Sequence, residues 1–371
     1  MKTVYILGAG FSVDAGAPTQ EELISEAFRL HALNRDHFDK DKFQVFEDFL
    51  LNQLNVPRER LGNVLLEDIF TPIDRCLSEG SQFRGVSLDQ IVVVREAVFY
   101  IVGKTIQLLL AETTKDQSYI ESFAEYLTRL SSQRSDYQYN YRDPVSVIST
   151  NWDILLDNSI KESIRKGGHD GVVDYCCYIS AKEKNDESIK PGLEKLGQGG
   201  FNVKLLKLHG SLNWLQCQRC MRLYASFFTK SAMHNSDGPC SCRHCDNNFP
   251  EEKGKHLLAS NLIMPTFIKD LSNPQYKTIW QNAGIEISEA DKLVFIGYSL
   301  PSADFEMRQL LSRMTRKNAE IEVIGRFDKI DQQGEIEACM NHWRSFFGSR
   351  KIEFKFSGAK GYVESLIDPN E

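Results

Sequence analysis

The stretch that decides the fold is VYILGAGFSVDAGAPT, residues 4–19. Its first four residues are apolar and predict a buried β-strand. The strand leads directly into Gly8-Ala9-Gly10, where the backbone can turn sharply and approach a ligand without a Cβ in the way. The sequence Thr19-Gln20-Glu21-Glu22 predicts a capped helix start, because a hydroxyl precedes carboxylates in the first turn. Strand, glycine turn and helix together are the phosphate-binding arrangement of dinucleotide-binding folds.

The spacing of the glycines differs from the usual one. The common fingerprint is G-x-G-x-x-G followed by an acidic residue about 20 positions on, and a pair of loop glycines is by itself a weak signal. The longer string Gly8-Ala9-Gly10-x-Ser12-x-x-x-Gly16-x-Pro18 is more specific. It resembles the opening motif of the sirtuin (silent information regulator) family, which binds NAD in an inverted Rossmann-type fold. The resemblance implies that Gly8, Ala9, Gly10, Ser12 and Gly16 contact NAD.

The composition is that of a soluble globular protein with two domains, or with one large domain and an insert. The chain has 371 residues, of which 42% are hydrophobic and 26% are charged. The net charge of −7 creates no global basic field, so we do not expect direct nucleic-acid binding.

The chain shows neither an export signal nor a membrane span. The apolar run before Gly8 is too short for a signal peptide. The longest apolar stretch, residues 91–110, contains Arg95, Glu96 and Lys104, so we expect a buried or interface helix there. We therefore expect a cytoplasmic protein whose nine cysteines are metal ligands or core residues rather than disulfides.

Strands and helices alternate along most of the chain, which predicts an α/β fold with a Rossmann-like parallel sheet covered on both faces. The expected strands are residues 4–7, 145–148, 205–208, 293–296, 321–324 and 352–356. Apolar residues at helical spacing predict an all-helical insertion over residues 30–144. The NAD-binding domain would then comprise residues 1–29 and 145–371.

Polar motifs follow three more of the expected strands. They are Ser149-Thr150-Asn151-Trp152-Asp153, Leu208-His209-Gly210-Ser211 and Gly297-Tyr298-Ser299-Leu300. In parallel sheets, ligands bind outside the carboxyl ends of the strands, so these motifs should meet Gly8–Gly10 at one edge. They resemble, in the same order along the chain, the Thr-Gln-Asn-Ile-Asp strand end of sirtuins, their catalytic-histidine segment and their Gly-Thr-Ser-Leu phosphate and ribose contact.

The resemblance implies chemistry at the anomeric carbon of the nicotinamide ribose. Asn151 would orient the ribose hydroxyls and water, and His209 would act as a base near neutral pH. Asp153 would orient Asn151 or contact the ribose, while Gly297 and Ser299 would contact the cofactor. Each residue also has an ordinary alternative, since a lone histidine is more often structural and a lone asparagine after a strand is more often a helix cap.

One departure from the family bears on the reaction. Protein deacylases continue the first motif with Asp-Phe-Arg after the proline, whereas this chain continues Pro18-Thr19-Gln20-Glu21. We therefore predict an NAD+ hydrolase that releases nicotinamide and ADP-ribose; the alternative is an NAD-dependent protein deacylase or ADP-ribosyltransferase. Divergent bacterial sirtuin-like proteins are often antiphage NAD-depleting effectors, as in Thoeris and in systems paired with a HerA-type ATPase, so the resemblance also implies a latent defence effector with such a partner.

Two Cys-x-x-Cys pairs, Cys217/Cys220 and Cys242/Cys245, predict a structural zinc ribbon within residues 213–262. Cys240 could replace Cys242, and His244 is a weaker substitute. Four thiolates leave no open position on the metal, so a catalytic zinc is not expected. The remaining cysteines do not lie at the spacing of metal-ligand pairs, and we interpret them as core or incidental residues. They are Cys76, Cys176, Cys177 and Cys339.

The insertion carries more large apolar residues than a covering layer needs. They include Phe46, Phe49, Leu66, Phe70, Phe99 and Ile101. We expect part of this surface to cover the NAD pocket as a lid. The remainder predicts a subunit interface and hence a homo-oligomer, because large apolar patches are rarely left in water.

Overall fold

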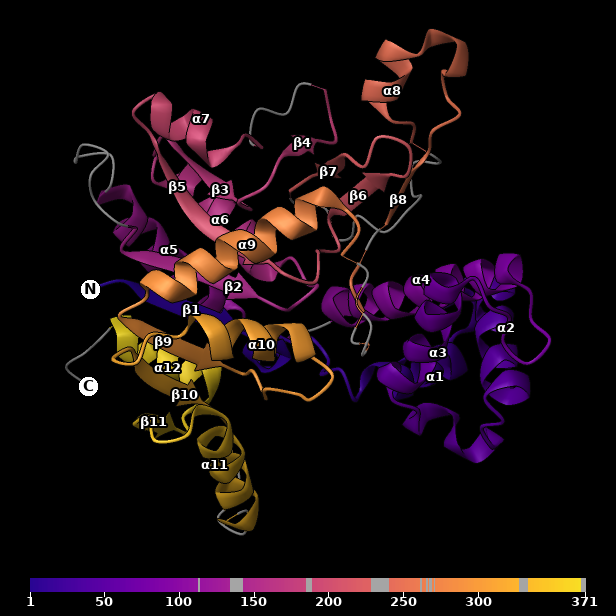
Figure 1. Ribbon diagram of the computed structural model, residues 1–371, viewed down its shortest axis with the longest axis horizontal. Helices are drawn as coiled ribbons and strands as arrows, with labels where there is room; N and C mark the ends of the chain where they lie inside the picture. The colour runs from indigo at the N-terminus through magenta and orange to yellow at the C-terminus, as the bar shows by residue number, and fades with distance from the viewer. Residues whose placement is uncertain are drawn as a thin grey trace.

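The computed structural model describes residues 1–112, 114–133, 143–184, 189–227, 240–260, 262–264, 266, 269, 271–326 and 333–367. Among these residues, seven strands form one sheet in the order β11-β10-β9-β1-β2-β5-β3, and every neighbouring pair is parallel. The strands are β1 (Thr3–Leu7), β2 (Val145–Ser149), β3 (Gly171–Asp174), β5 (Phe201–Lys207), β9 (Lys292–Ile296), β10 (Glu320–Ile324) and β11 (Ile352–Lys355). The predicted parallel α/β sheet is confirmed (Figure 1).

Helices cover both faces of this sheet, as the alternating pattern predicts. In β1, Tyr5 packs against Phe123 of α5 (Ser118–Ser132). In β9, Phe295 packs against Trp343 of α11 (Gln333–Phe347). Tyr5 is in register with Val294 rather than with Phe295, so these two rings lie on opposite faces. The other helices on the sheet are α6 (Leu155–Lys166), α7 (Gly192–Gly197), α9 (Pro274–Glu289), α10 (Phe305–Met314) and α12 (Gly358–Ile367).

The sheet has a switch in chain direction at β1. From β1 the chain moves to β2 and then to the edge strand β3, and it returns to β5, which lies between β2 and β3. It then crosses to β9 on the other side of β1 and continues to β10 and β11. The carboxyl ends of β1, β2 and β9 therefore diverge around one crevice, which is where open α/β sheets bind ligands.

The helices before α5 form a separate layer beside the sheet, seen at the right of Figure 1. They are α1 (Leu23–Leu33), α2 (Lys40–Asp48), α3 (Leu66–Glu79) and α4 (Leu88–Glu112), and they share a hydrophobic core of their own. We call α1 to α4 the helical module. The apolar residues from which a subunit interface was expected are buried, most of them completely; they are Phe46, Phe49, Leu66, Phe70, Phe99 and Ile101. These six side chains are thus used inside the module.

The hydrophobic cores suggest domain boundaries different from those expected from sequence. Tyr119, Phe123 and Leu127 of α5 belong to the core of the sheet, whereas Leu23 and Leu30 of α1 belong to the core of the module. We propose that the module runs from α1 to α4 and that α5 is part of the sheet domain.

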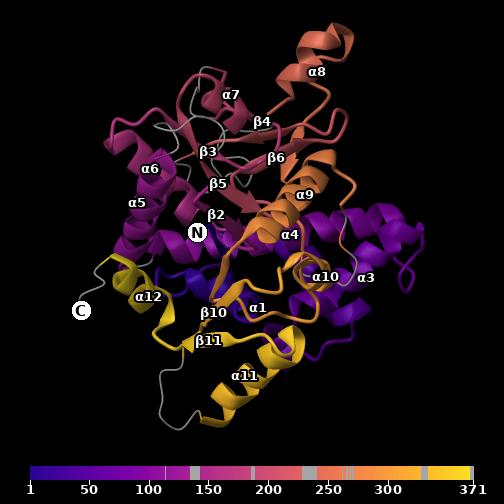
Figure 2. The same ribbon diagram turned by 60° about the vertical axis from the view of Figure 1, so that its left-hand side comes forward.

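A second, smaller sheet carries the cysteines. Among the described residues its strands run β4 (Ile179–Ala181), β7 (Leu223–Ala225), β6 (Trp214–Cys217) and β8 (Leu258–Ser260), and the short helix α8 (Arg243–Asn248) lies beside it. In Figures 1 and 2, α8 projects from the end of the molecule opposite α11. No helix in the described part of the chain is long and apolar enough to cross a membrane.

The strands of the smaller sheet were not among those expected, and further local features also differ from the expectations. Strand β3 was not predicted because only Val172 and Val173 in it are large and apolar, and β5 begins at Phe201, four residues before the expected start. Helix α1 begins at Leu23. The Thr19 hydroxyl does not cap it; instead the Thr19 N–H and hydroxyl both donate to Glu22 Oε2, at 2.8 and 2.9 Å, which holds the turn before the helix.

Candidate active site

The motifs that follow β1, β2, β5 and β9 meet at one cavity of about 430 Å³, a volume within the usual range of small-molecule and cofactor sites. Of the residues predicted to bind or act on NAD, the cavity is lined by Gly8, Ala9, Gly10, Asn151, Asp153, His209, Gly297 and Ser299. Ser12 and Gly16 do not line it. The parallel sheet therefore brings together, at its carboxyl edge, residues that lie nearly 300 positions apart in the sequence.

The glycines allow the loops after β1 and β9 to interlock. A Cβ on Gly8 would lie 2.5 Å from the Gly297 carbonyl oxygen, and one on Gly10 would lie 2.8 Å from Gly297 Cα. Gly297 has a φ of +61°, and a Cβ on it would lie 2.2 Å from the Phe11 nitrogen. The N–H groups of Gly8 and Gly10 donate to the carbonyls of Ile296 and Gly297. Packing between the two loops therefore requires these glycines, whether or not a phosphate binds there.

Asn151 presents an unused hydrogen-bond acceptor. Its Nδ2 donates to the Gly8 carbonyl at 2.9 Å, and a carbonyl can only accept, so the amide orientation is determined. The residue is 9% exposed, and its buried Oδ1 has no hydrogen-bond partner among the described residues. Such a group is costly unless water or a ligand donates to it. Asn151 thus fits recognition of a hydroxyl group.

Asp153 is connected to Asn151 through the hydroxyl of Ser12 rather than by a direct hydrogen bond. Its Oδ2 accepts from the Ser12 hydroxyl at 2.9 Å, and Ser12 Oγ lies 3.5 Å from Asn151 Nδ2. Its Oδ1 accepts from the Leu155 N–H at the start of α6. Burial raises the pKa of the Asp153 carboxyl, although the nearby Lys207 ammonium opposes the shift. Lys207 itself is buried and donates to the Asp153 carbonyl and to Asp157.

His209 follows β5 and faces a carboxylate that the sequence analysis did not single out. Its Nε2 lies 3.3 Å from Oδ1 of Asp304, the residue before α10. The same oxygen lies 3.1 Å from the Lys269 ammonium, and Asp304 Oδ2 accepts from the Tyr298 hydroxyl at 2.7 Å. Burial alone would raise the pKa of Asp304, but its electrostatic interactions with His209 and Lys269 and the hydrogen bond from Tyr298 hold that pKa well below the usual range.

Asp304 and Lys269 also line the cavity, as does Tyr298. Asp304 could have been noticed as the acidic residue four positions after the Gly297-Tyr298-Ser299-Leu300 motif, although a helix cap was the ordinary reading of it. Lys269 lies in a segment without a recognisable pattern, and only the fold brings it to the site.

The helical module forms part of the cavity wall. Leu23, Leu65, Glu67 and Ile106 line it, together with residues 17–21 of the segment that leads from β1 into α1. Gln20 donates to Glu67 at 2.5 Å, which joins that segment to α3. The module therefore contributes an apolar and acidic wall opposite the strand ends.

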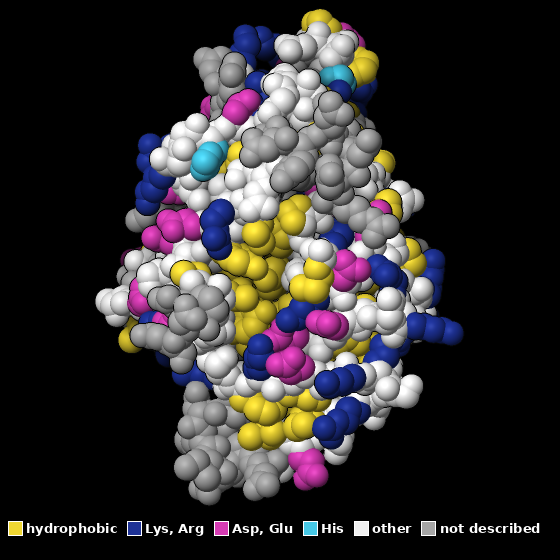
Figure 3. Space-filling model, turned by 90° about the vertical axis from the view of Figure 1, so that its left-hand side faces the viewer, with side chains coloured by type: hydrophobic (Ala, Val, Ile, Leu, Met, Phe, Trp, Pro, Cys, Tyr) yellow, Lys and Arg dark blue, Asp and Glu magenta, His cyan; other side chains and the backbone are white. Residues whose placement is uncertain are grey.

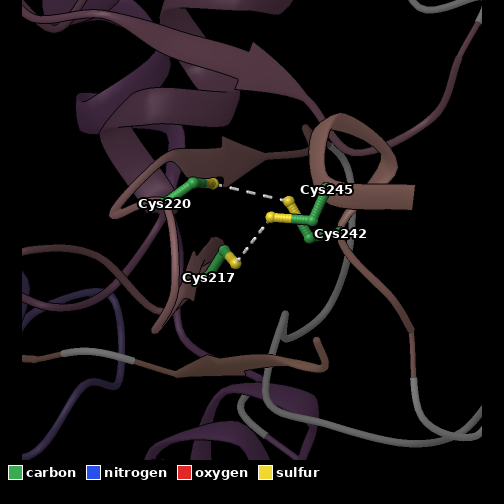
Figure 4. A group of neighbouring side chains, drawn as sticks. All are labelled: Cys217, Cys220, Cys242 and Cys245. Carbon is green, nitrogen blue, oxygen red and sulfur yellow. Dashed lines mark hydrogen bonds between the residues drawn. The ribbon is translucent and has the colours of Figure 1, made fainter. Parts of the chain in front are cut away.

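Four cysteine thiols come together at the end of β6. The Sγ atoms of Cys217, Cys220, Cys242 and Cys245 lie within 4.8 Å of one another (Figure 4). The Cys217–Cys245 and Cys220–Cys242 distances are 3.8 and 3.6 Å. A tetrahedral zinc with bonds of about 2.3 Å separates its sulfurs by about 3.8 Å, so this donor set fits zinc. Cys240 and His244 are outside the group, and Cys242 is the cysteine that the fold brings into it.

Charged side chains form no single basic surface on the face shown in Figure 3. Lys and Arg are interspersed there with Asp and Glu, around a strip of hydrophobic side chains. This distribution agrees with the net charge of −7.

Solved structures similar to this chain include sirtuins. A mutant Sir2 homologue in complex with ADP-ribose is 13% identical, with a TM-score of 0.38, over 99% of this chain and 90% of that chain. Sir2 bound to an acetylated peptide is 12% identical, with a TM-score of 0.37, over 99% and 92% of the two chains. Identities this low carry no information about activity. No protein-family model matches the chain, and no curated protein sequence matches it.

Proposed function

We propose that this chain hydrolyses NAD+ to nicotinamide and ADP-ribose in the cavity at the carboxyl edge of the sheet. The observation that carries the proposal is the pair formed by Asn151, with its buried and unpartnered Oδ1, and His209, both on one cavity beside the glycine loops. The four motifs resemble those of sirtuins in their residues and in their order along the chain, and this resemblance favours NAD+ as the substrate.

In the proposed reaction the bond between ribose C1′ and the nicotinamide nitrogen breaks. Its electron pair stays on the nitrogen, which becomes neutral, while positive charge develops on the ribose. Asn151 Oδ1 accepts from a ribose hydroxyl and fixes the ring. A water oxygen then bonds to C1′, and the proton that it loses passes to His209. Ionised Asp304 beside the imidazole stabilises the imidazolium that forms.

For the cysteine cluster we propose a structural zinc. Cys217 and Cys220 come from the end of β6 and the following turn, whereas Cys242 and Cys245 come from the start of α8. The metal would tie the two segments together. Since all four thiols belong to the cluster, we assign no catalytic step to it.

Product analysis tests the hydrolase proposal. The purified protein is mixed with NAD+, and nicotinamide and ADP-ribose are quantified by mass spectrometry. We expect equimolar products without any added acceptor, and we expect His209→Ala to reduce turnover by about 10²-fold or more. Wild-type turnover in His209→Ala would refute the role of His209.

The same assay separates the alternative activities. A deacylase releases nicotinamide only when an acylated peptide is added and then forms acyl-ADP-ribose. An ADP-ribosyltransferase leaves ADP-ribose on an acceptor protein. Either result would replace hydrolysis as the function of this site, because all three reactions begin by breaking the same bond.

We further propose that the protein is a latent antiphage effector that depletes NAD+, with homo-oligomerisation or a HerA-type ATPase partner as its activating event. This proposal rests on the motif resemblance. Expression of wild type and His209→Ala in bacteria, with cellular NAD+ measured before and during phage infection, tests it. Unchanged NAD+ in infected cells that carry the wild type would contradict it.

A further inference from the structure

Asp304 is held in place by groups from three segments of the chain. The Tyr298 hydroxyl follows β9, Lys269 precedes α9, and His209 follows β5. Only 4% of Asp304 is exposed. An aspartate before a helix usually caps its first N–H groups, but in the described part of the chain Asp304 forms no side-chain cap with α10. Its carboxylate is directed to the cavity instead, so helix capping does not explain it.

The Asp304 carboxylate faces one nitrogen of the His209 imidazole, Nε2. His209 Nε2 is buried and lies 3.3 Å from Asp304 Oδ1, within ion-pair distance, and neither atom forms a hydrogen bond with any other group in the described part of the chain. A neutral imidazole carries one proton, and a facing carboxylate can only accept, so the proton belongs on Nε2. The lone pair is then on Nδ1. Histidines that work at metal and catalytic sites are oriented by carboxylates in the same manner.

We propose that Asp304 is a positioning residue that holds His209 as its Nε2–H tautomer, so that Nδ1 is the nitrogen that takes the proton from water. This inference rests on the proposed hydrolase function. When Nδ1 gains the proton, Nε2–H still faces Asp304, which remains ionised. Lys269 also faces Asp304 Oδ1 and is paired with Glu306 at 2.9 Å, so its charge is shared between two carboxylates.

The tautomer can be measured without any variant. In wild-type protein labelled with ¹⁵N-histidine, the chemical shifts of neutral His209, assigned by its loss in His209→Ala, should show a protonated Nε2 and an unprotonated Nδ1. The Nδ1–H tautomer would overturn the proposal. This readout does not depend on turnover, so it remains informative even if the protein does not hydrolyse NAD+.

Kinetics provide the second test. Asp304→Asn keeps the size of the side chain and removes its charge, so it should lower kcat by about 10²-fold while the KM for NAD+ changes by less than about 3-fold. The pH values at which kcat falls on the acid and alkaline sides of its pH profile should also change. Glu306→Gln is the matched control, because Glu306 contacts Lys269 but not His209, and it should stay within about 3-fold of wild type.

Three outcomes would overturn the inference. Asp304→Asn could turn over like wild type, it could change only KM, or Glu306→Gln could lose as much kcat as Asp304→Asn. If Asp304→Asn does not fold, as judged by circular dichroism, the tautomer measurement on wild type decides alone. Absence of NAD+ cleavage by wild type, in contrast, would refute the proposed function and leave the tautomer question standing.

Discussion

Replacing Asn151 with alanine separates two contributions that the structure assigns to one amide. Removal of Nδ2 takes one of two donors from the buried Gly8 carbonyl, which still accepts from the Phe11 N–H at 2.9 Å, so the free energy of unfolding should fall by about 0.5–1.5 kcal/mol. Removal of Oδ1 deletes the acceptor proposed to fix the ribose. Losing one such positioned hydrogen bond in a transition state costs about 10²–10³-fold in kcat. Asn151→Ala should therefore be both less stable and more than about 10²-fold less active.

Ser12→Ala is the comparator, because it should cost at least as much stability without removing a contact to the substrate. The Ser12 hydroxyl donates to the buried Asp153 carboxyl at 2.9 Å, and hydrogen bonds to charged groups contribute about 1.5–3 kcal/mol. Ser12 does not line the cavity, and Asn151 keeps its bond to Gly8 in this variant. We expect the loss in kcat to stay below about 10-fold, since geometry is disturbed but no contact to substrate is removed.

Nicotinamide release at saturating NAD+ measures kcat, urea unfolding measures stability, and calorimetry with ADP-ribose measures binding. The reasoning fails if Asn151→Ala retains turnover within about 3-fold of wild type. It also fails if Ser12→Ala loses as much activity as Asn151→Ala, since the hydroxyl rather than the amide would then contact the substrate.

The remaining predictions concern the glycine loops, the cysteine cluster and the effect of pH. Gly8→Ala should lower stability by about 3 kcal/mol in thermal or urea unfolding, because its Cβ would lie 2.5 Å from the Gly297 carbonyl oxygen. A Cβ on Gly197 would meet no described atom within 4 Å, so Gly197→Ala should stay within about 0.5 kcal/mol of wild type. Equal losses would contradict the interlocked loops. Cys242→Ser should abolish zinc binding measured by mass spectrometry and lower stability, while Cys240→Ser should retain one zinc per chain. Burial raises the pKa of the Asp153 carboxyl in the folded protein. The folded state therefore loses stability relative to the unfolded state as pH rises above the usual aspartate pKa of about 3.9. Asp153→Asn should therefore gain melting temperature relative to wild type at pH 8 and lose that gain near pH 4; a difference independent of pH would refute this.

Much of the fold was readable from local patterns. Short apolar runs such as Val4-Tyr5-Ile6-Leu7 predict strands because both of their faces must be buried in a covered parallel sheet. Cys-x-x-Cys pairs indicate a metal cluster because two residues between cysteines bring the thiols to one centre. The sequence did not show that α5 belongs to the sheet, since its helical spacing is the same as that of the module helices and only packing distinguishes them.

The sequence by itself determined which chemical groups follow the strands: the glycines after β1, the amide of Asn151 after β2 and the imidazole of His209 after β5. The tertiary structure alone decided what these groups contact. Asp304 reaches His209, and Lys269 reaches Asp304, because the sheet places the segments before α9 and α10 next to the end of β5. Ser12 was expected at the ligand but lies behind Asn151, because the turn after Gly10 directs its hydroxyl to Asp153. Pairwise contacts of this kind depend on strand order and loop packing, which residue patterns along the chain do not encode locally.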